Sequence, residues 1–204
     1  MSVGPQRPGK TTFLMLLGLT CSMSGSAWVC GYNVITHPIE VRKRVSFVPE
    51  VPGLYGDLTA RENLTFTADL NGLPRGVREK KIEGLLERVG LPKWADEKVG
   101  KFSRGMKQRL AIADTLVRDP KVLILDEPTA GVDLAGSEEI LSLLKTLTRD
   151  EGITVLMSSH LLHYVEKYSD RIAIMNRGDI VRVGSVGSLT KGKNVIELEL
   201  VEVD

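Results

Sequence analysis

The chain has 204 residues, of which 42% are apolar, and its 27 basic residues nearly balance its 26 acidic ones. This composition suits one well-packed core and lacks the charge excess that would favour a nucleic-acid partner. Apolar runs such as Phe13 to Leu17 fall far short of the roughly 20 residues that cross a bilayer, and no signal peptide opens the chain. We therefore expect a cytosolic α/β protein with no direct membrane insertion.

The chain begins with a glycine-rich stretch that has the spacing of a phosphate-binding loop. Gly4, Gly9, Lys10 and Thr11 satisfy the pattern G-x-x-x-x-G-K-[ST], and Thr12 follows them. In such a loop, backbone N–H groups and the N-terminus of the next helix face phosphate oxygens, the lysine reaches the terminal phosphates and the hydroxyl binds Mg²⁺. The sequence therefore predicts a nucleotide phosphate site here.

Short apolar runs between chain breakers predict the strands of a parallel sheet, with helical patterns between them. The runs are Val45 to Val48, Val122 to Leu125, Ile153 to Met157 and Arg171 to Met175. Between Pro49 and Leu116 the chain is rich in glycine and charge, and we expect a helical subdomain that projects from the sheet. Its predicted helices are Thr59 to Leu70, Val77 to Val89 and Gly105 to Val117.

The remaining elements complete the α/β pattern. After Asp133, a structural helix is predicted by apolar residues at helical spacing, namely Leu134, Ile140, Leu141, Leu144 and Leu147. Asn176 to Asp179 lies between two short apolar runs and predicts a hairpin. Val195 to Val203 alternates apolar with acidic residues, which predicts a strand.

Two carboxylates, Asp126 and Glu127, follow a strand that is apolar throughout. A strand buried on both faces can present them only at its C-terminal end, the edge at which α/β sheets bind ligands. Asp126 is suited to hold Mg²⁺ through water, and Glu127 to orient and deprotonate an attacking water. A pair of solvated acids would explain these two residues alone, but the phosphate loop upstream favours the catalytic interpretation.

A third motif runs from Phe102 to Leu110 and places Ser103 and Gly105 just before a helix. Ser103 can cap that helix, whose dipole can then face an anion. An ordinary helix cap would explain a lone serine. The whole string, which lies shortly before the acidic strand, resembles the signature motif of ATP-binding cassette (ABC) ATPases.

Other ABC motifs follow in the family's order. Val45 to Glu50 resembles the Q-loop region, Ala130 to Asp133 the D-loop, and Ser158 to His160 the H-loop that follows a strand. Val48 to Tyr55 and Ser159 to Leu162 further resemble ATPase subunits of ABC-2-type exporters. The resemblance implies a P-loop NTPase (RecA-like) fold with a parallel sheet and an inserted helical subdomain.

The resemblance also implies a domain organisation. We expect one ABC nucleotide-binding domain, with a RecA-like core at 1–50 and 118–185, a helical subdomain at 51–117, and a C-terminal strand or the start of an extension at 186–204. Because so few residues precede Gly4, the family's N-terminal antiparallel β-subdomain is expected to be largely missing.

By the same resemblance the chain is an ATPase that uses ATP and Mg²⁺ and couples hydrolysis to transport. Glu127 would be the catalytic base, and His160 would contact the γ-phosphate. The nucleotide-binding residues would be Gly4, Gly9, Lys10, Thr11, Thr12, Ser103, Gly105 and Asp133, and the metal ligands Thr11, Asp126 and Glu50. Two ATPase domains would pair head to tail, as a homodimer or a heterodimer, beneath a membrane permease on the inner face of the cell membrane.

The phosphate loop departs from the family in its interior, which reads Gln6-Arg7-Pro8 in place of Asn-Gly-Ala. Arg7 stands where a positive φ is wanted, and Pro8 has no N–H to donate to a phosphate. Losing one charge-assisted hydrogen bond costs about 1.5 to 3 kcal/mol, or about tenfold to a hundredfold or more in affinity. A degenerate or regulatory ABC subunit with impaired nucleotide binding is therefore the alternative hypothesis.

Overall fold

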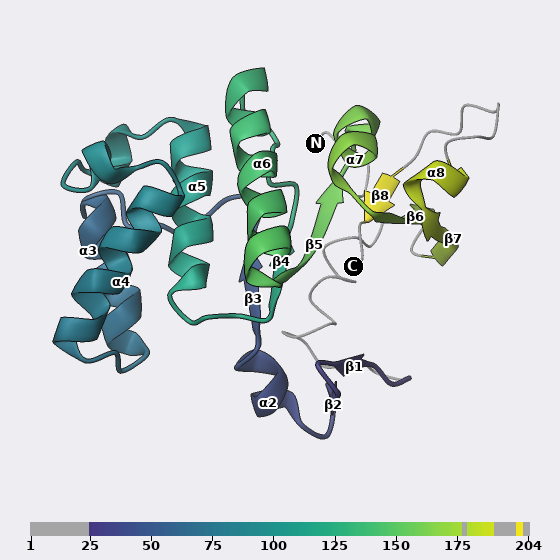
Figure 1. The fold of residues 1–204 in the computed structure, drawn as a ribbon, viewed down its shortest axis with the longest axis horizontal. Helices are drawn as coiled ribbons and strands as arrows, with labels where there is room; N and C mark the ends of the chain where they lie inside the picture. Colours follow the sequence, from purple (N-terminus) through teal and green to yellow (C-terminus); the bar gives the residue numbers. More distant parts are fainter. Residues whose placement is uncertain (1–24, 177–178, 190–198, 202–204) are drawn as a thin grey trace, which may run out of the picture.

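A computed structural model describes residues 25–176, 179–189 and 199–201, and its centre is a twisted sheet (Figure 1). Six strands lie in the order β3-β4-β5-β8-β6-β7. Their bounds are β3 Val45–Val48, β4 Val122–Leu125, β5 Thr154–Ser159, β6 Arg171–Asn176, β7 Asp179–Ser185 and β8 Glu199–Val201. The predicted bounds of β3 and β4 are confirmed, whereas β5 runs two residues further than predicted, to Ser159.

The first three strands run parallel, which brings their carboxyl ends to one edge of the sheet. Val122 pairs with Val45 on β3 and with Thr154 on β5, and Leu125 pairs with Met157 at the other end of the β4–β5 ladder. The short β8 is antiparallel to both β5 and β6, so β5 and β6 themselves run in the same direction. Most of the predicted strand from 195 to 203 lies outside the described residues.

The predicted hairpin at Asn176 to Asp179 is confirmed. Strands β6 and β7 are antiparallel, and Asn176 pairs with Asp179 at the turn. With β7 at the end of the strand order, the hairpin forms one margin of the sheet.

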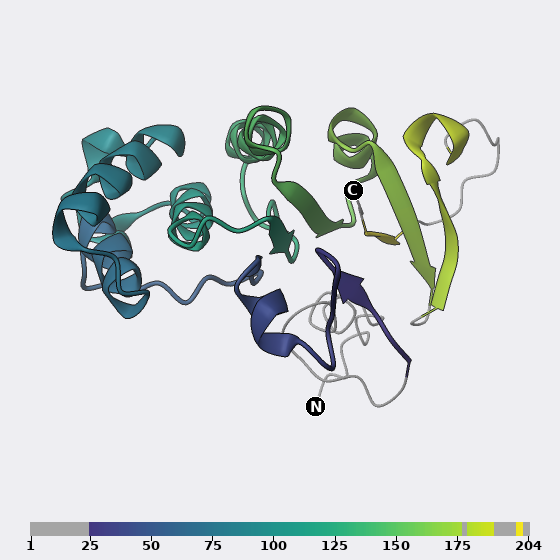
Figure 2. The same ribbon diagram turned by 60° about the horizontal axis from the view of Figure 1, so that its bottom comes forward.

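Both faces of the sheet are covered, which explains why β4 is apolar throughout. Helices α5 (Arg104–Leu116), α6 (Leu134–Glu151) and α7 (Leu162–Tyr168) lie on one face, while α2 (Pro38–Arg42) and the pair β1 (Trp28–Val29) and β2 (Tyr32–Asn33) lie on the other (Figure 2). Leu123 and Leu125 belong to the first core, and Ile124 belongs to the second.

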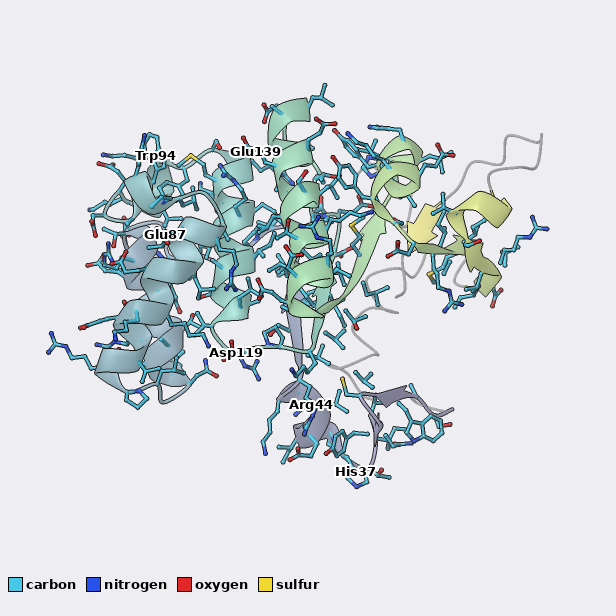
Figure 3. The ribbon with its side chains drawn as sticks, viewed as in Figure 1. His37, Arg44, Glu87, Trp94, Asp119 and Glu139 are labelled. Carbon is cyan, nitrogen blue, oxygen red and sulfur yellow. The ribbon has the colours of Figure 1, made fainter. Side chains whose placement is uncertain are left out.

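A stacked cation holds α2 to the small β1–β2 hairpin. The Arg44 guanidinium carbon lies 4.3 Å from the centroid of the Tyr32 ring, and Arg44 Nη1 donates to Glu40 Oε2 at 2.7 Å. Figure 3 shows Arg44 and His37 in this lower part of the molecule. The contact attaches the second covering layer to the entrance of β3.

The helical insert lies to one side of the sheet (Figure 1). It contains α3 (Ala60–Leu70), α4 (Arg75–Arg88), the short 3-10 turns η1 (Pro92–Trp94) and η2 (Val99–Lys101), and α5. Thr59 and Glu62 form a reciprocal capping box at the start of α3, which satisfies two backbone N–H groups. Leu64, Leu86 and Leu110 are fully buried between these helices. The three predicted helices are confirmed to within two residues at each end.

Helix α6 confirms four of the five apolar positions predicted for its inner face. Ile140, Leu141, Leu144 and Leu147 are buried, but Leu134 is 70% exposed. That prediction was wrong: Leu134 is the first residue of α6, and the buried positions of the helix begin one turn later, at Ser137. A further short helix is α8 (Val186–Leu189). Within the described residues, no helix is long and apolar enough to span a membrane.

Leu147 and Leu134 provide a matched test of this packing on a single helix. Leu147→Ala should lower the free energy of unfolding by about 2 to 5 kcal/mol, because it empties a fully buried site. Leu134→Ala should change it by less than about 0.5 kcal/mol. Chemical denaturation of both variants measures the difference, and equal effects would contradict the placement of α6.

Candidate functional site

The predicted site residues separate into two groups in the structure. Those of the phosphate loop, Gly4, Gly9, Lys10, Thr11 and Thr12, lie outside the described residues. The others come from the carboxyl ends of β3, β4 and β5 and from the N-termini of α5 and α6; they are Glu50, Ser103, Gly105, Asp126, Glu127, Asp133 and His160. Parallel pairing of the strands gathers residues that are far apart in the sequence.

Asp126 is held at the tip of β4 from both sides. Its backbone N–H donates to the Val48 carbonyl of β3 at 2.9 Å. On the other side, Ser158 Oγ of β5 donates to Asp126 Oδ1 at 2.6 Å. The residue is only 6% exposed, so its carboxylate is fixed in direction by buried groups.

Glu127 and His160 meet across the ends of β4 and β5. His160 Nδ1 lies 2.8 Å from Glu127 Oε2, and since a carboxylate only accepts, Nδ1 carries the proton. The Glu127 side chain is 11% exposed and that of His160 is 56% exposed. The predicted base therefore lies in a sheltered position, in contact with the more exposed imidazole.

The backbone at Glu127 is strained. Its φ is +46°, in the left-handed region that a residue with a side chain seldom adopts. Such a conformation costs about 1 kcal/mol or more and persists only where surrounding contacts enforce it. Glu127 N–H donates to Ser158 Oγ at 2.8 Å, and Ala130 N–H donates to the Glu127 carbonyl at 3.0 Å.

Arg104 connects three of the predicted motifs. Its Nη2 lies 4.0 Å from Glu50 Oε1, and its guanidinium covers Gly131 so closely that a Cβ there would lie 2.8 Å from Nη1. Arg104 itself stands between Ser103 and Gly105. Neither Arg104 nor Ser158 was predicted as a site residue from the sequence. A basic residue within the signature motif, and a serine directly after the predicted apolar strand Ile153 to Met157, were the available signals.

Ser103 and Gly105 open α5 as predicted. The Ser103 side chain accepts from the Met106 N–H at 3.2 Å, so the expected N-cap is confirmed. This bond uses a lone pair, which leaves the hydroxyl proton able to donate to an anion. Gly105 packs against Val132, whose Cγ1 would lie 3.2 Å from a Cβ at that position.

Asp133 stands at the N-cap position of α6, although its side chain makes no capping hydrogen bond. Its Oδ1 instead lies against Gly136, only 2.8 Å from where a Cβ would be. The D-loop aspartate is exposed at the start of α6.

The available ligands suit Mg²⁺ better than a metal ion that is bound entirely by protein side chains. Within the described residues, no group of three or more His, Cys, Asp or Glu side chains is arranged to hold a metal ion. Mg²⁺ is commonly bound by one or two carboxylates together with waters and substrate phosphates. The buried, oriented carboxylate of Asp126 provides a hard oxygen ligand of this kind.

A buried parallel strand that ends in two carboxylates, beside a histidine from the next strand, defines the hydrolytic edge of a P-loop NTPase. Residues 3–130, which extend from the phosphate loop through the acidic pair, match the profile of the ABC transporter family. The chain belongs to this family.

Among its relatives, the bacitracin transport ATP-binding protein BcrA of Bacillus licheniformis is 41% identical over 180 residues, which make up 88% of this chain and 58% of the relative. The chain spans between 58% and 64% of the length of three curated relatives that it matches.

Two solved structures share the fold. One is cbiO1 from Clostridium perfringens, part of the ABC transporter complex cbiONQ; it has a TM-score of 0.83, is 30% identical, and the match covers 91% of this chain and 76% of that one. The other is the ATP-binding cassette MJ0796, a dimer in a post-hydrolysis state bound to ADP and Pi, with a TM-score of 0.75 and 27% identity over 87% of this chain and 81% of that one.

Gly131 and Gly152 provide a matched test of the Arg104 contact. Both have positive φ, but a Cβ at Gly152 meets nothing within 4 Å. Gly152→Ala should lower the free energy of unfolding by about 1 to 2 kcal/mol through backbone strain alone. Gly131→Ala should cost more, because it also displaces Arg104. Thermal unfolding of both variants checks this, and equal losses would show that Arg104 does not pack there.

Proposed function

We propose that this chain is the ATP-binding and ATP-hydrolysing subunit of an ABC-2-type exporter, which powers substrate movement through a separate membrane permease. The observation that carries the proposal is the 2.8 Å contact between His160 and Glu127 at the end of the buried β4. The exporter subgroup is supported by the sequence from Val48 to Tyr55 and by the likeness to a bacitracin transport protein.

In this proposal Glu127 orients the attacking water and takes its proton, while His160 faces the γ-phosphate. Glu127 is sheltered, and its carboxylate accepts a hydrogen bond from His160 Nδ1, which holds the carboxylate in one orientation. The ATP phosphates would be held by Gly4, Gly9, Lys10, Thr11 and Thr12. Asp126, Thr11 and Glu50 would hold Mg²⁺, which supplies positive charge against the phosphate oxygens.

A second ATPase domain would complete the site. Ser103 and Gly105, at the positive N-terminus of α5, would close on the nucleotide held by a partner copy, and Asp133 would lie at the same interface. The dimeric arrangement of the MJ0796 relative supports this proposal. Either two copies of this chain or a related second subunit could form the pair.

The permease would dock in a groove between the sheet and the helical insert. A cavity of about 380 Å³ lies there, lined by Glu50, Val51, Pro52, Leu54, Gly56, Val99, Arg104 and Lys107. Val51 is 75% exposed and Tyr55 is 53% exposed, so apolar surface is available beside it. Glu50 lines both this groove and the proposed metal site, which would couple docking to hydrolysis. The subunit would then sit peripherally on the inner face of the membrane.

The catalytic role is tested by Glu127→Gln. Phosphate release at saturating MgATP should fall by about a hundredfold or more, because the amide cannot accept the water's proton. Nucleotide binding, followed by fluorescence of a labelled ATP, should be retained. Glu139→Gln is the control, since Glu139 is an exposed acid of α6 that pairs with Arg109 and has no role in the proposed mechanism. Unchanged turnover in Glu127→Gln would exclude Glu127 as the base.

The phosphate loop favours a second candidate, a degenerate subunit that binds a permease or a competent ATPase without turning over ATP. Gln6→Asn, Arg7→Gly and Pro8→Ala together should raise ATP affinity by about tenfold to a hundredfold, because a backbone donor is restored. Titration calorimetry and phosphate release measure both properties in the two proteins. Hydrolysis only in the triple variant would favour the degenerate reading, whereas hydrolysis in both would exclude it.

A further inference from the structure

Ser158 is a fully buried serine whose hydroxyl touches both members of the acidic pair. It is the last residue but one of β5 and is 0% exposed. Its Oγ lies 2.6 Å from Asp126 Oδ1 and 2.8 Å from the backbone nitrogen of Glu127. No motif-based role was predicted for it, because the H-loop resemblance assigns a function only to His160.

The two hydrogen bonds allow only one assignment of donor and acceptor roles to the Ser158 hydroxyl. A serine hydroxyl has one proton and can accept through its lone pairs. The proton must be donated to the Asp126 carboxylate, and the Glu127 N–H must donate to the oxygen. One buried oxygen atom therefore sets the direction of a carboxylate and fixes the backbone of the next residue.

The position of Ser158 follows from strand register. Leu125 pairs with Met157 in the parallel ladder between β4 and β5, so Ser158 comes one residue after the last pair, level with Asp126. Val48 holds the Asp126 backbone from β3 on the opposite side. Both neighbouring strands therefore hydrogen-bond to the residue that follows β4. Val48 binds the backbone of Asp126, and Ser158 binds its side chain.

The hydrogen bonds of Ser158 matter because the backbone of Glu127 is strained. A residue with φ of +46° relaxes toward ordinary values unless contacts enforce it. The Ser158 bond to the Glu127 N–H acts directly at that residue. Relaxation of the Glu127 backbone would swing its side chain away from His160, because the position of the side chain depends on the direction in which the backbone leaves β4.

We infer that Ser158 is a positioning residue for hydrolysis, which orients Asp126 toward the metal and Glu127 toward the attacking water. The inference rests on the proposed function, because it gives Glu127 and Asp126 the roles assigned there. Ser158 itself would touch neither nucleotide nor metal.

The experiment compares Ser158→Ala, Ser158→Cys and Ser158→Thr. Alanine removes the hydroxyl, cysteine keeps the volume with a weak donor, and threonine restores the hydroxyl on a β-branched side chain that suits a strand. Ser46→Ala is the control: Ser46 is a buried serine of β3, 5% exposed, whose Oγ donates to the Thr115 carbonyl at 3.3 Å, away from the acidic pair.

Two readouts distinguish positioning from general stability. In MgATP hydrolysis, Ser158→Ala and Ser158→Cys should lower kcat by about tenfold or more, with KM changed less than about twofold, and threonine should recover most of the loss. In the nucleotide-free protein, amide hydrogen exchange at Glu127 should speed up in the alanine and cysteine variants alone, because the N–H loses its acceptor. Ser46→Ala should change neither readout.

The inference is overturned if the folded alanine or cysteine variant keeps its kcat within about twofold of the parent chain, a change too small for a lost charge-assisted hydrogen bond, or exchanges the Glu127 amide at the parent rate. Should the parent chain itself fail to hydrolyse ATP, the proposed function fails, and the Glu127 exchange rates still decide whether Ser158 holds that backbone.

Discussion

The pairing of β4 between β3 and β5 is the constraint on which the site depends. Leu123, Ile124 and Leu125 are completely buried, so the strand can place polar groups only beyond its last residue. A slip of one residue would move Asp126 by about 3.3 Å along the strand. That shift would break the 2.6 Å bond from Ser158, so the parallel register and the direction of the carboxylate are set together.

Helix α5, the last helix of the insert, connects the rest of the insert to the hydrolytic edge. It packs on the sheet, where Ser46 Oγ donates to the Thr115 carbonyl, and its N-terminus begins at Ser103 beside the insert. Arg104 then reaches Glu50 on one side and Gly131 on the other. Glu50 lines the groove proposed for the permease, and it follows β3 at the same edge of the sheet as the acidic pair.

The strained backbone of Glu127 lies next to a rigid part of the sheet. Glu127 holds an unfavourable backbone conformation, and the groups that enforce it come from a buried strand end that has little freedom to move. Preorganisation of this kind stabilises a transition state without rearrangement at the moment of reaction. The cost is met by the packing of two cores on opposite faces of the sheet.

Local patterns in the sequence were sufficient for β3, β4, the three helices of the insert, the Ser103 cap and the acidic pair, because each depends on neighbouring residues and their periodicity. The tertiary structure alone decided that Leu134 faces solvent, that Arg104 reaches Glu50, and that Ser158 and His160 meet Asp126 and Glu127. The residues in these contacts stand more than thirty positions apart, and strand register and helix rotation bring them together. Strand register and helix rotation cannot be predicted from the residues that neighbour each of these positions in the sequence.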